Sequence, residues 1–206
     1  MNVSGIVLAG GMSQRLGRNK AIEPVGGESL ISRVIGRISE ITDETIVVVA
    51  DMDQASVLPL PESVVVATDI YPDKGSLGGI FSGLTAAGGE WGLVVSCDMP
   101  FLNIELFRYM LDRREGFDIV MPLLDGRPEP THALYSKGCL SYIEGQLEAS
   151  DLKIARFFNA VRVNFVTEEE IERLDPTHLS FFNINTEQDL EQARSLTAQR
   201  NKEVAR

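Results

Sequence analysis

The sequence is poor in cysteine and histidine, and it contains no long hydrophobic run. Two cysteines and two histidines occur among its 206 residues. Cys97 and Cys139 are too few and too far apart for a disulfide framework or a cysteine metal cluster, so we expect reduced thiols in a cytoplasmic protein. No apolar segment approaches the roughly 20 residues that cross a bilayer. The first residues carry neither the basic region nor the apolar stretch of a secretory signal, and none is expected.

Basic residues are also scarce relative to acidic ones. The chain has 19 Lys and Arg against 30 Asp and Glu, which gives a formal net charge of −11. Because nucleic acids and anionic membrane surfaces select basic patches, we expect neither as a partner. A phosphorylated small molecule is compatible with this balance, since local cations and a bound metal decide its affinity.

Alternating strand and helix patterns fill most of the chain. Apolar runs indicate strands over 6–9, 45–50, 64–67, 91–96, 118–122, 131–136 and 161–166. Helical spacing of apolar residues indicates helices over 29–40, 77–87, 103–114, 137–147, 152–159 and 186–198. This alternation predicts an α/β three-layer sandwich with a mostly parallel sheet. We expect residues 1–198 to form a single domain and residues 199–206 a polar tail.

Glycine and cations are concentrated near the N-terminus, in the segment GIVLAGGMSQRLGRNK from Gly5 to Lys20. The strand predicted there ends at Gly10-Gly11, where the backbone can turn sharply and approach a ligand. Ser13, Arg15 and Lys20 follow, and backbone N–H groups with converging cations suit a polyphosphate. Local chemistry leaves a second interpretation open, namely a strand-to-helix turn with a solvated basic surface.

Two familiar phosphate motifs do not fit this segment. A P-loop requires G-x-x-x-x-G-K-[ST], but Gly17 is followed by Arg18, and Gly10-Gly11-Met12 does not give the dinucleotide pattern G-x-G-x-x-G. The remaining pattern, L-A-G-G-x-S-x-R-[LM]-G-x-x-K, resembles the signature loop of nucleotidyltransferases. Within that superfamily the chain looks most like the molybdenum cofactor guanylyltransferases, and the resemblance runs from Gly5 to about Leu190. It implies a Rossmann-like nucleotidyltransferase fold.

The resemblance also implies a reaction and a nucleotide site. GMP would pass from Mg-GTP to the phosphate of molybdopterin that carries molybdenum, and pyrophosphate would leave. Nucleotide contacts are implied for Leu8, Ala9, Gly10, Gly11, Ser13, Lys20, Asp69, Gly78 and Asp98. Two positions depart from the family pattern. Ser76 replaces the usual proline, and Asp51 stands where an asparagine often helps to bind the base.

Asp98 follows the strand predicted over 91–96, in the segment Cys97-Asp98-Met99-Pro100. In parallel sheets ligands bind beyond the carboxyl ends of strands, and Mg²⁺ needs only one or two carboxylates besides substrate phosphates. Taken alone, Asp98 could equally cap the helix predicted from residue 103. The segment matches the family's D-x-P motif that holds magnesium, so the resemblance implies Asp98 as the metal ligand and Mg²⁺ as the cofactor.

Nucleotidyl transfer depends on charge compensation and alignment, so we expect Arg15, Lys20 and Asp98 to be the catalytic residues. Arg15 can contact β- and γ-phosphate oxygens with both arms of its guanidinium. Lys20, a compact charge, suits the α-phosphate. Arg18 is as consistent with a solvated side chain as with a phosphate ligand.

The acceptor side rests on Asn183-Ile184-Asn185-Thr186, which matches the family's N-x-N-T motif. It implies that Asn183 and Asn185 bind the acceptor, although turn chemistry before the last helix also suits asparagine. His132 lies in a predicted strand, which favours a structural histidine, and His178 is expected at the surface. The glutamates in 168–170 favour the N-terminus of a helix over a metal site.

Three alternatives remain open. The same chemistry could use CTP with the same acceptor, or a nucleotide with a sugar phosphate. A non-catalytic nucleotide-binding partner in cofactor assembly is a further alternative, although retention of Arg15, Lys20 and Asp98 together argues against it. Other cofactor-synthesis proteins and molybdoenzymes are candidate protein partners.

Overall fold

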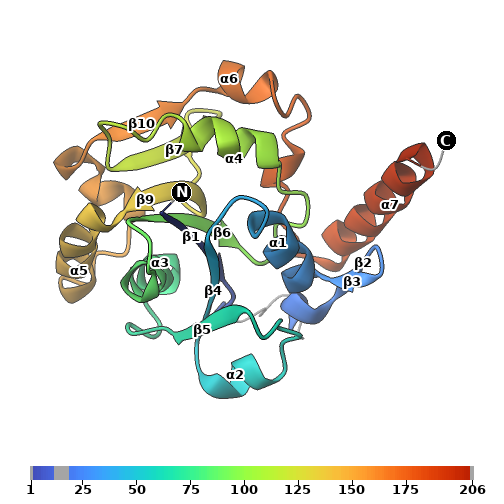
Figure 1. Cartoon of the computed structure of the whole chain (residues 1–206), viewed down its shortest axis with the longest axis horizontal. Coiled ribbons are helices and arrows are strands. Elements are labelled where there is room, and N and C mark those ends of the chain that lie inside the picture. Colours follow the sequence, from blue (N-terminus) through green and yellow to red (C-terminus); the bar gives the residue numbers. More distant parts are fainter. Residues whose placement is uncertain (1, 12–18, 205–206) are drawn as a thin grey trace.

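One mixed sheet forms the centre of the molecule, and helices cover both of its faces (Figure 1). The structure is a computed structural model that describes residues 2–11 and 19–204. Across the sheet the strands are β10 (Val163–Val166), β7 (Ile119–Leu124), β9 (His132–Ser136), β6 (Trp91–Ser96), β1 (Val3–Leu8), β4 (Glu44–Val49) and β5 (Val64–Thr68), with β8 (Arg127–Pro128) paired to β7. Only the pairs that involve β8 or β9 are antiparallel among these. The predicted three-layer, mostly parallel architecture is confirmed.

The two faces of the sheet bury alternate residues of each strand, as the strand period of two requires. Val7 and Val47 contribute to the apolar cluster beneath α1 (Leu30–Ile38), α4 (Ile104–Leu111) and α6 (Glu168–Glu172). Ile6 and Ile46 contribute to the opposite cluster, beneath α3 (Gly75–Ala86), α5 (Leu140–Glu148) and the 3-10 helix η3 (Ile154–Ala160). Both central strands are therefore buried on both faces, which explains their continuous apolar sequences.

A third, smaller cluster fixes the C-terminal helix, α7 (Glu187–Val204). Leu190 and Ala193 of α7 pack against Val25 of the hairpin formed by β2 (Pro24–Val25) and β3 (Glu28–Ser29). The sequence analysis ends this helix at residue 198, whereas α7 continues to Val204 because the intervening residues contain neither glycine nor proline. The division into a domain and a tail at this position stays a prediction.

Two segments that lie between the predicted strands and helices contain regular structure. Residues 51–53 lead into α2 (Met52–Ser56), because the Asp51 side chain accepts a hydrogen bond from the Gln54 N–H at 2.8 Å and caps the helix. The segment over 123–130, between two predicted strands, is largely a hairpin between β7 and β8. Asp125 and Gly126 both adopt positive φ angles, 48° and 70°, as a two-residue hairpin turn requires. The segment predicted as an α-helix over 152–159 forms the 3-10 helix η3 instead.

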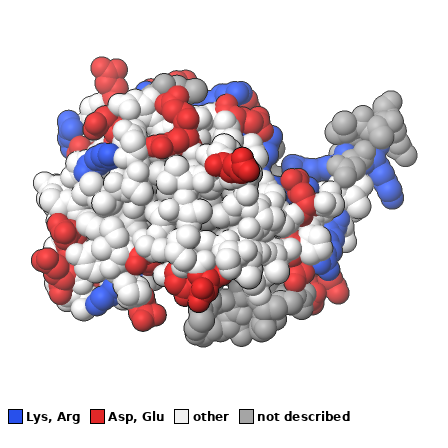
Figure 2. All heavy atoms as spheres, turned by 60° about the horizontal axis from the view of Figure 1, so that its bottom comes forward, with Lys and Arg blue, Asp and Glu red and all other residues white. Residues whose placement is uncertain are grey.

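Acidic side chains dominate the charged surface. On the face shown in Figure 2, acidic and basic side chains lie mainly around a broad area without charged groups. Within the described residues no helix is both long and apolar enough to cross a bilayer.

His132 is part of the core, as predicted for a structural histidine. Its ring is fully buried, stacks on Phe107 at a centroid distance of 4.4 Å and lies against Phe181 at 4.4 Å. Its Nε2 atom is 3.4 Å from the Ser180 hydroxyl. Burial disfavours the charged imidazolium and lowers the pKa of His132 to about 3.

This buried histidine makes the free energy of unfolding depend on pH. Between the ordinary value of 6.5 and about 3, the unfolded chain binds a proton that the folded chain does not. As the pH decreases through this window, the contribution of His132 should lower the free energy of unfolding by up to about 1.4 kcal/mol per pH unit. Above pH 6.5 the contribution of His132 should not change with pH. Urea unfolding at pH 4.5 to 7 should show a shallower pH dependence in His132→Gln than in the wild type. Ser195→Ala, on the exposed side of α7, is the control and should keep the wild-type slope, so equal slopes in all three proteins would contradict the prediction.

Candidate active site

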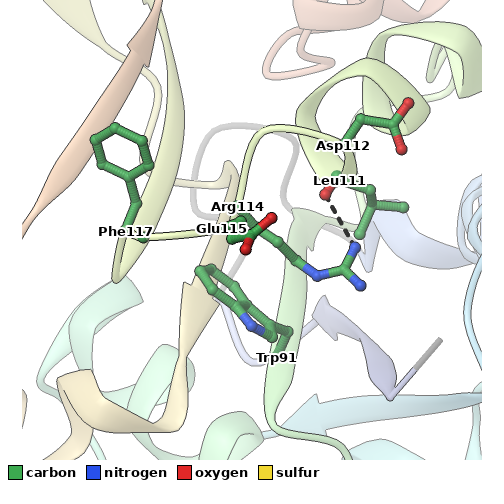
Figure 3. A pocket seen from close by; sticks show the side chains of 7 residues that line it. Trp91, Leu111, Asp112, Arg114, Glu115 and Phe117 are labelled. Carbon is green, nitrogen blue, oxygen red and sulfur yellow. Dashed lines mark hydrogen bonds between the residues drawn. The ribbon is translucent and has the colours of Figure 1, made fainter.

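A cavity and the predicted functional residues lie at opposite ends of the strands of the sheet, the cavity at the amino ends and the residues at the carboxyl ends. The cavity, about 580 Å³, is lined by residues at the start of β6 and between α4 and β7, including Trp91, Arg114 and Phe117 (Figure 3). The predicted nucleotide-binding residues follow the other ends of the strands. Since ligands of parallel sheets bind beyond the carboxyl ends, we take the candidate site from that edge.

The strand order creates a switch point between β1 and β6. From β1 the chain proceeds to β4 and β5 on one side, and then to β6 on the other side of β1. Leu8 pairs with Ser96, and the Cys97 N–H donates to the Leu8 carbonyl at 3.1 Å. The loop that begins at Ala9 and the loop that carries Asp98 therefore leave the sheet side by side.

Lys20 joins three segments that are far apart in the sequence. It begins the 3-10 helix η1 (Lys20–Ile22), and its ammonium group donates to the Asp98 carboxylate. The same group donates to the Ile184 carbonyl and to Asn185 Oδ1, both at 3.3 Å. The Lys20 and Asp98 side chains are only 17% and 8% exposed. This arrangement connects a predicted catalytic pair to the predicted acceptor segment.

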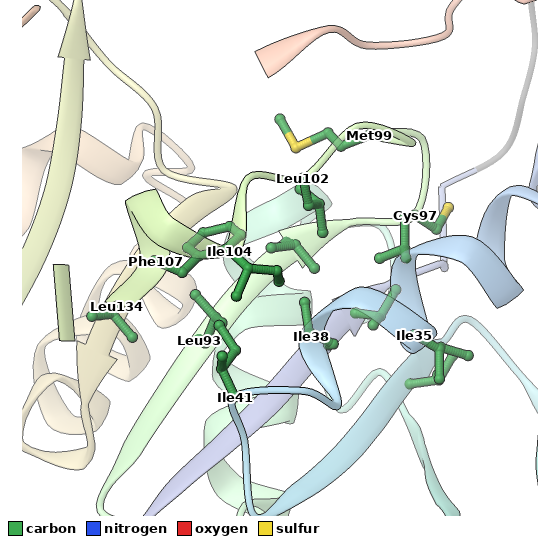
Figure 4. Close-up of a cluster of buried hydrophobic side chains, with 14 of the residues drawn as sticks. Ile35, Ile38, Ile41, Leu93, Cys97, Met99, Leu102, Ile104, Phe107 and Leu134 are labelled. Carbon is green, nitrogen blue, oxygen red and sulfur yellow. The ribbon is translucent and has the colours of Figure 1, made fainter. Parts of the chain in front are cut away.

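The apolar core holds the Asp98 loop in place on both sides. Cys97, Met99 and Leu102 are buried in the cluster beneath α1 and α4 (Figure 4). The Asp98 carbonyl also accepts the Ile184 N–H at 3.0 Å. The backbone of Asp98 is therefore held in place, and the loop conformation determines the position of its carboxylate.

One oxygen of Asp98 fits the role of a metal ligand. Oδ2 binds Lys20, whereas Oδ1 is buried and has no hydrogen-bond partner among the described residues. The helix-cap alternative is wrong, because Asn103 caps α4 by accepting from the Glu105 and Leu106 N–H groups. A buried acceptor without a donor is costly unless something else binds it. A divalent cation, which prefers carboxylate oxygens, is chemically suited to that position.

Asp69 and Gly78 shape the loop before α3. Asp69 Oδ1 accepts from the Tyr71 N–H at 3.1 Å and from the Ser82 hydroxyl at 2.9 Å. A Cβ atom at Gly78 would lie 2.7 Å from the Tyr71 carbonyl, so this close packing requires glycine. Both residues have a structural role in the described chain, and their nucleotide contacts stay predictions.

Ser82 supports the same loop, and its removal should lower stability. It is 1% exposed, and its hydroxyl accepts the Ile70 N–H at 2.8 Å. Ser82→Ala leaves that N–H without a partner, so we expect the free energy of unfolding to fall by about 1–3 kcal/mol. Urea unfolding measures the change, and Ser195→Ala on the exposed side of α7 is the control. An unchanged urea midpoint in Ser82→Ala would show that this hydrogen bond is dispensable.

The remaining predicted residues differ in what the structure says of them. Leu8, Ala9 and Gly10 lie at the end of β1, and Gly11 is exposed beyond them. Asn185 contacts Lys20, whereas the Asn183 side-chain amide donates to the Phe181 carbonyl at 3.1 Å and shows no contact with Lys20. The predictions for Ser13, Arg15 and Arg18 lie outside the described residues.

Gln54 forms hydrogen bonds beside the candidate site that were not predicted from the sequence. Its side-chain amide donates to the Ala9 carbonyl at 2.7 Å, and its carbonyl accepts the Ala50 N–H at 2.8 Å. It thereby joins the ends of β1 and β4. The sequence does indicate a helix here, since an aspartate followed three residues later by a glutamine, as at Asp51 and Gln54, is typical of a helix N-terminus. Asp51 is that cap, so its side chain is engaged in α2.

The two cysteines contribute packing only. Cys97 and Cys139 are free and buried, and burial raises the pKa of each thiol to about 12, with the charge of Asp98 adding to the effect at Cys97. Both therefore stay protonated at neutral pH. Neither is suited to act as a nucleophile.

Comparisons with known proteins agree with this geometry. Residues 5–164 match the model of the MobA-like NTP transferase domain. The chain is 40% identical to the "Probable molybdenum cofactor guanylyltransferase" of Pelotomaculum thermopropionicum, covering 94% of this chain and 93% of that protein. It is 36% identical to the molybdenum cofactor guanylyltransferase of Desulfosudis oleivorans, covering 94% and 95%.

Solved structures share the fold. The molybdopterin-guanine dinucleotide biosynthesis protein A of Archaeoglobus fulgidus superposes with a TM-score of 0.83 at 28% identity, covering 95% of this chain and 99% of that one. The 2-C-methyl-D-erythritol 4-phosphate cytidylyltransferase of Thermus thermophilus gives 0.70 at 19% identity, covering 96% and 100%. The latter likeness concerns the fold alone.

Proposed function

Because the chain belongs to the molybdenum cofactor guanylyltransferases of the MobA-like NTP transferase family, we propose that it transfers GMP from Mg-GTP to the phosphate of molybdenum-molybdopterin. An acceptor phosphate oxygen forms a bond to the α-phosphorus, and the bond from that phosphorus to the bridging oxygen breaks. The products are the guanine dinucleotide form of the cofactor and pyrophosphate. The observation that carries the proposal is the convergence of Asp98, Lys20 and Asn185 at the carboxyl edge.

Asp98 would hold the metal through Oδ1, the buried acceptor without a protein donor. Mg²⁺ is the expected ion, and when bound with the nucleotide it neutralises the charge of the phosphates. The Asp98 loop needs no rearrangement of its backbone to do this, because its carbonyl and its apolar neighbours anchor it independently of the carboxylate.

Lys20 would stabilise the negative charge that develops around the α-phosphate as pyrophosphate leaves. Its ammonium group contacts both Asp98, the proposed metal ligand, and Asn185, in the proposed acceptor segment, which supports this role. Such preorganised charge acts on the transition state without reorganisation cost. Arg15, predicted to bind the β- and γ-phosphates, would complete the set. A general base is unnecessary, since the acceptor phosphate is already ionised at neutral pH.

Asn183 and Asn185 are the proposed acceptor ligands, with Asn185 the better supported because it contacts Lys20 directly. Asn183 would need to exchange its bond to the Phe181 carbonyl for one to the acceptor. We further propose that the enzyme acts in the cytoplasm, and that other cofactor-synthesis proteins and molybdoenzymes are its protein partners.

Pyrophosphate release tests the proposal. The purified chain is incubated with molybdenum-loaded molybdopterin, Mg²⁺ and each of GTP, CTP, ATP and UTP in turn. We expect GTP to give the highest rate, and no release without the acceptor. A preference for CTP would make the chain a cytidylyltransferase. Binding of GTP without turnover, under conditions in which an established guanylyltransferase is active, would favour the non-catalytic alternative.

A further inference from the structure

Glu168, Glu172 and His178 form a cluster of metal-ligating side chains outside the Lys20–Asp98 site. One ligand atom of each residue lies within 4.8 Å of the other two. Glu168 and Glu172 are one turn apart on the same face of α6. After α6 the chain turns back, the His178 N–H donates to the Asp175 carbonyl at 2.9 Å, and the imidazole returns to that face of the helix. We call these three residues the Glu–Glu–His cluster.

The neighbouring glutamates of α6 are engaged by other side chains, but the cluster is not. Glu169 pairs with Arg173 at 2.5 Å, and Glu170 accepts a hydrogen bond from the Tyr109 hydroxyl at 2.6 Å. Among the described residues no lysine or arginine forms an ion pair with Glu168 or Glu172. Glu168 accepts a hydrogen bond from the Asp125 backbone N–H at 3.4 Å. Two carboxylates thus lie close together without a lysine or arginine paired to either of them among the described residues.

His178 supplies the second observation. The sequence analysis expects a surface residue, but its side chain is half-buried, and its Nε2 atom is buried without a hydrogen-bond partner among the described residues. Buried ring nitrogens are normally hydrogen-bonded, so one without a partner needs an explanation. One imidazole nitrogen of His178 lies near an oxygen of each carboxylate, and a cation that all three side chains bind would account for this arrangement.

The donor set indicates which kind of cation. An imidazole nitrogen with carboxylate oxygens suits a divalent transition metal such as Zn²⁺, whereas Mg²⁺ and Ca²⁺ select oxygen ligands only. Bonds of about 2.0–2.2 Å to Zn²⁺ require the three ligand atoms to approach one another more closely than 4.8 Å. The exposed Glu172 side chain has the rotational freedom to close that gap, and water would complete the coordination.

We propose that Glu168, Glu172 and His178 bind one divalent transition-metal ion, and that this ion cross-links α6 to the turn before the 3-10 helix η4 (Leu179–Phe181). The cross-link would restrain the segment that leads from α6 to Asn183. That role is structural, and it holds whether or not the chain transfers GMP.

Zinc titration of the metal-free full chain tests the site. Calorimetry is done on Asp98→Asn protein, so that the proposed active-site ligand does not contribute. We expect this Asp98→Asn protein, the parent, to bind one equivalent of Zn²⁺. When Glu172→Gln or His178→Asn is introduced into the parent, the affinity for Zn²⁺ should fall at least tenfold. Asparagine tolerates the left-handed backbone of His178, whose φ is 52°, so the fold is kept. Glu169→Gln is the matched control and should bind Zn²⁺ like the parent.

Thermal unfolding gives a second readout. At a hundredfold excess of Zn²⁺ over its Kd, we expect Tm to rise by about 5 °C in the parent protein and to stay unchanged in His178→Asn. Failure of the parent to bind one equivalent would overturn the proposal. Equal affinity in the parent, Glu172→Gln and His178→Asn would also overturn it, because the ion would then be bound elsewhere.

Discussion

Asp98→Asn is expected to lower the rate of pyrophosphate release by about 10³-fold or more, the largest effect of any single substitution considered for this chain. Asparagine has nearly the same size and keeps an oxygen that can accept from Lys20, so the loop should stay folded. What it removes is the negative charge that we propose holds a divalent cation at Oδ1, the buried oxygen without a hydrogen-bond partner among the described residues. The rate should not recover when the Mg²⁺ concentration is raised tenfold above that which saturates the wild type.

Asp112→Asn is the matched control for this substitution. Asp112 is exposed at the end of α4 and lines the cavity at the opposite edge of the sheet. Its substitution should leave the rate within a factor of two of the wild type. Wild-type pyrophosphate release by Asp98→Asn would show that the metal assignment is wrong. A loss of rate of similar size in Asp112→Asn would instead indicate that the reaction takes place at the cavity near the start of β6.

Lys20→Met is expected to lower the same rate by about 10²–10³-fold, because it removes a preorganised positive charge from the place proposed for the α-phosphate. Methionine keeps an unbranched side chain of similar length, so the aliphatic packing of Lys20 is largely retained. The substitution also leaves the Asp98 carboxylate, which is 8% exposed, without its ion-pair partner. We therefore expect a lower urea midpoint in addition to the lower rate.

The two effects of Lys20→Met can be separated. In the double variant Lys20→Met with Asp98→Asn, the uncompensated charge is gone, so the urea midpoint should recover towards the wild type while the rate stays low. Lys153→Met, an exposed lysine before η3, is the control and should change neither quantity. If Lys20→Met slows the reaction only as far as its loss of folded protein explains, Lys20 has a structural role alone.

Local sequence patterns predicted most of the fold. The strand over 91–96 has the predicted bounds, because six apolar or small residues between two turn signals leave little alternative. The helix N-terminus at the glutamates in 168–170 was also predicted from adjacent residues and is confirmed, with Thr167 and Glu170 forming a capping box. These features depend on residues within one turn of each other.

Features that depend on distant contacts were not predictable in the same way. The direction of β9 depends on its pairing with β6 and β7, and its own sequence is equally compatible with a parallel strand. The contact between Lys20 and Asn185 joins residues 165 positions apart. His178 was predicted at the surface because nothing in its neighbours reveals that the chain folds back onto α6. The missed start of α2 at Asp51 differs, since its capping signal was local.

The position of Lys20 couples the two halves of the site thermodynamically. One ammonium group donates to Asp98, on the side proposed to bind the nucleotide, and to Asn185 and the Ile184 carbonyl, on the side proposed to bind the acceptor. A phosphate that draws Lys20 towards the nucleotide weakens its hold on the acceptor segment, and the reverse is also true. By reciprocity, the factor by which GTP changes the affinity for the acceptor must equal the factor by which the acceptor changes the affinity for GTP. On the proposed assignment of the site, Lys20 therefore makes the two binding equilibria a single linked system.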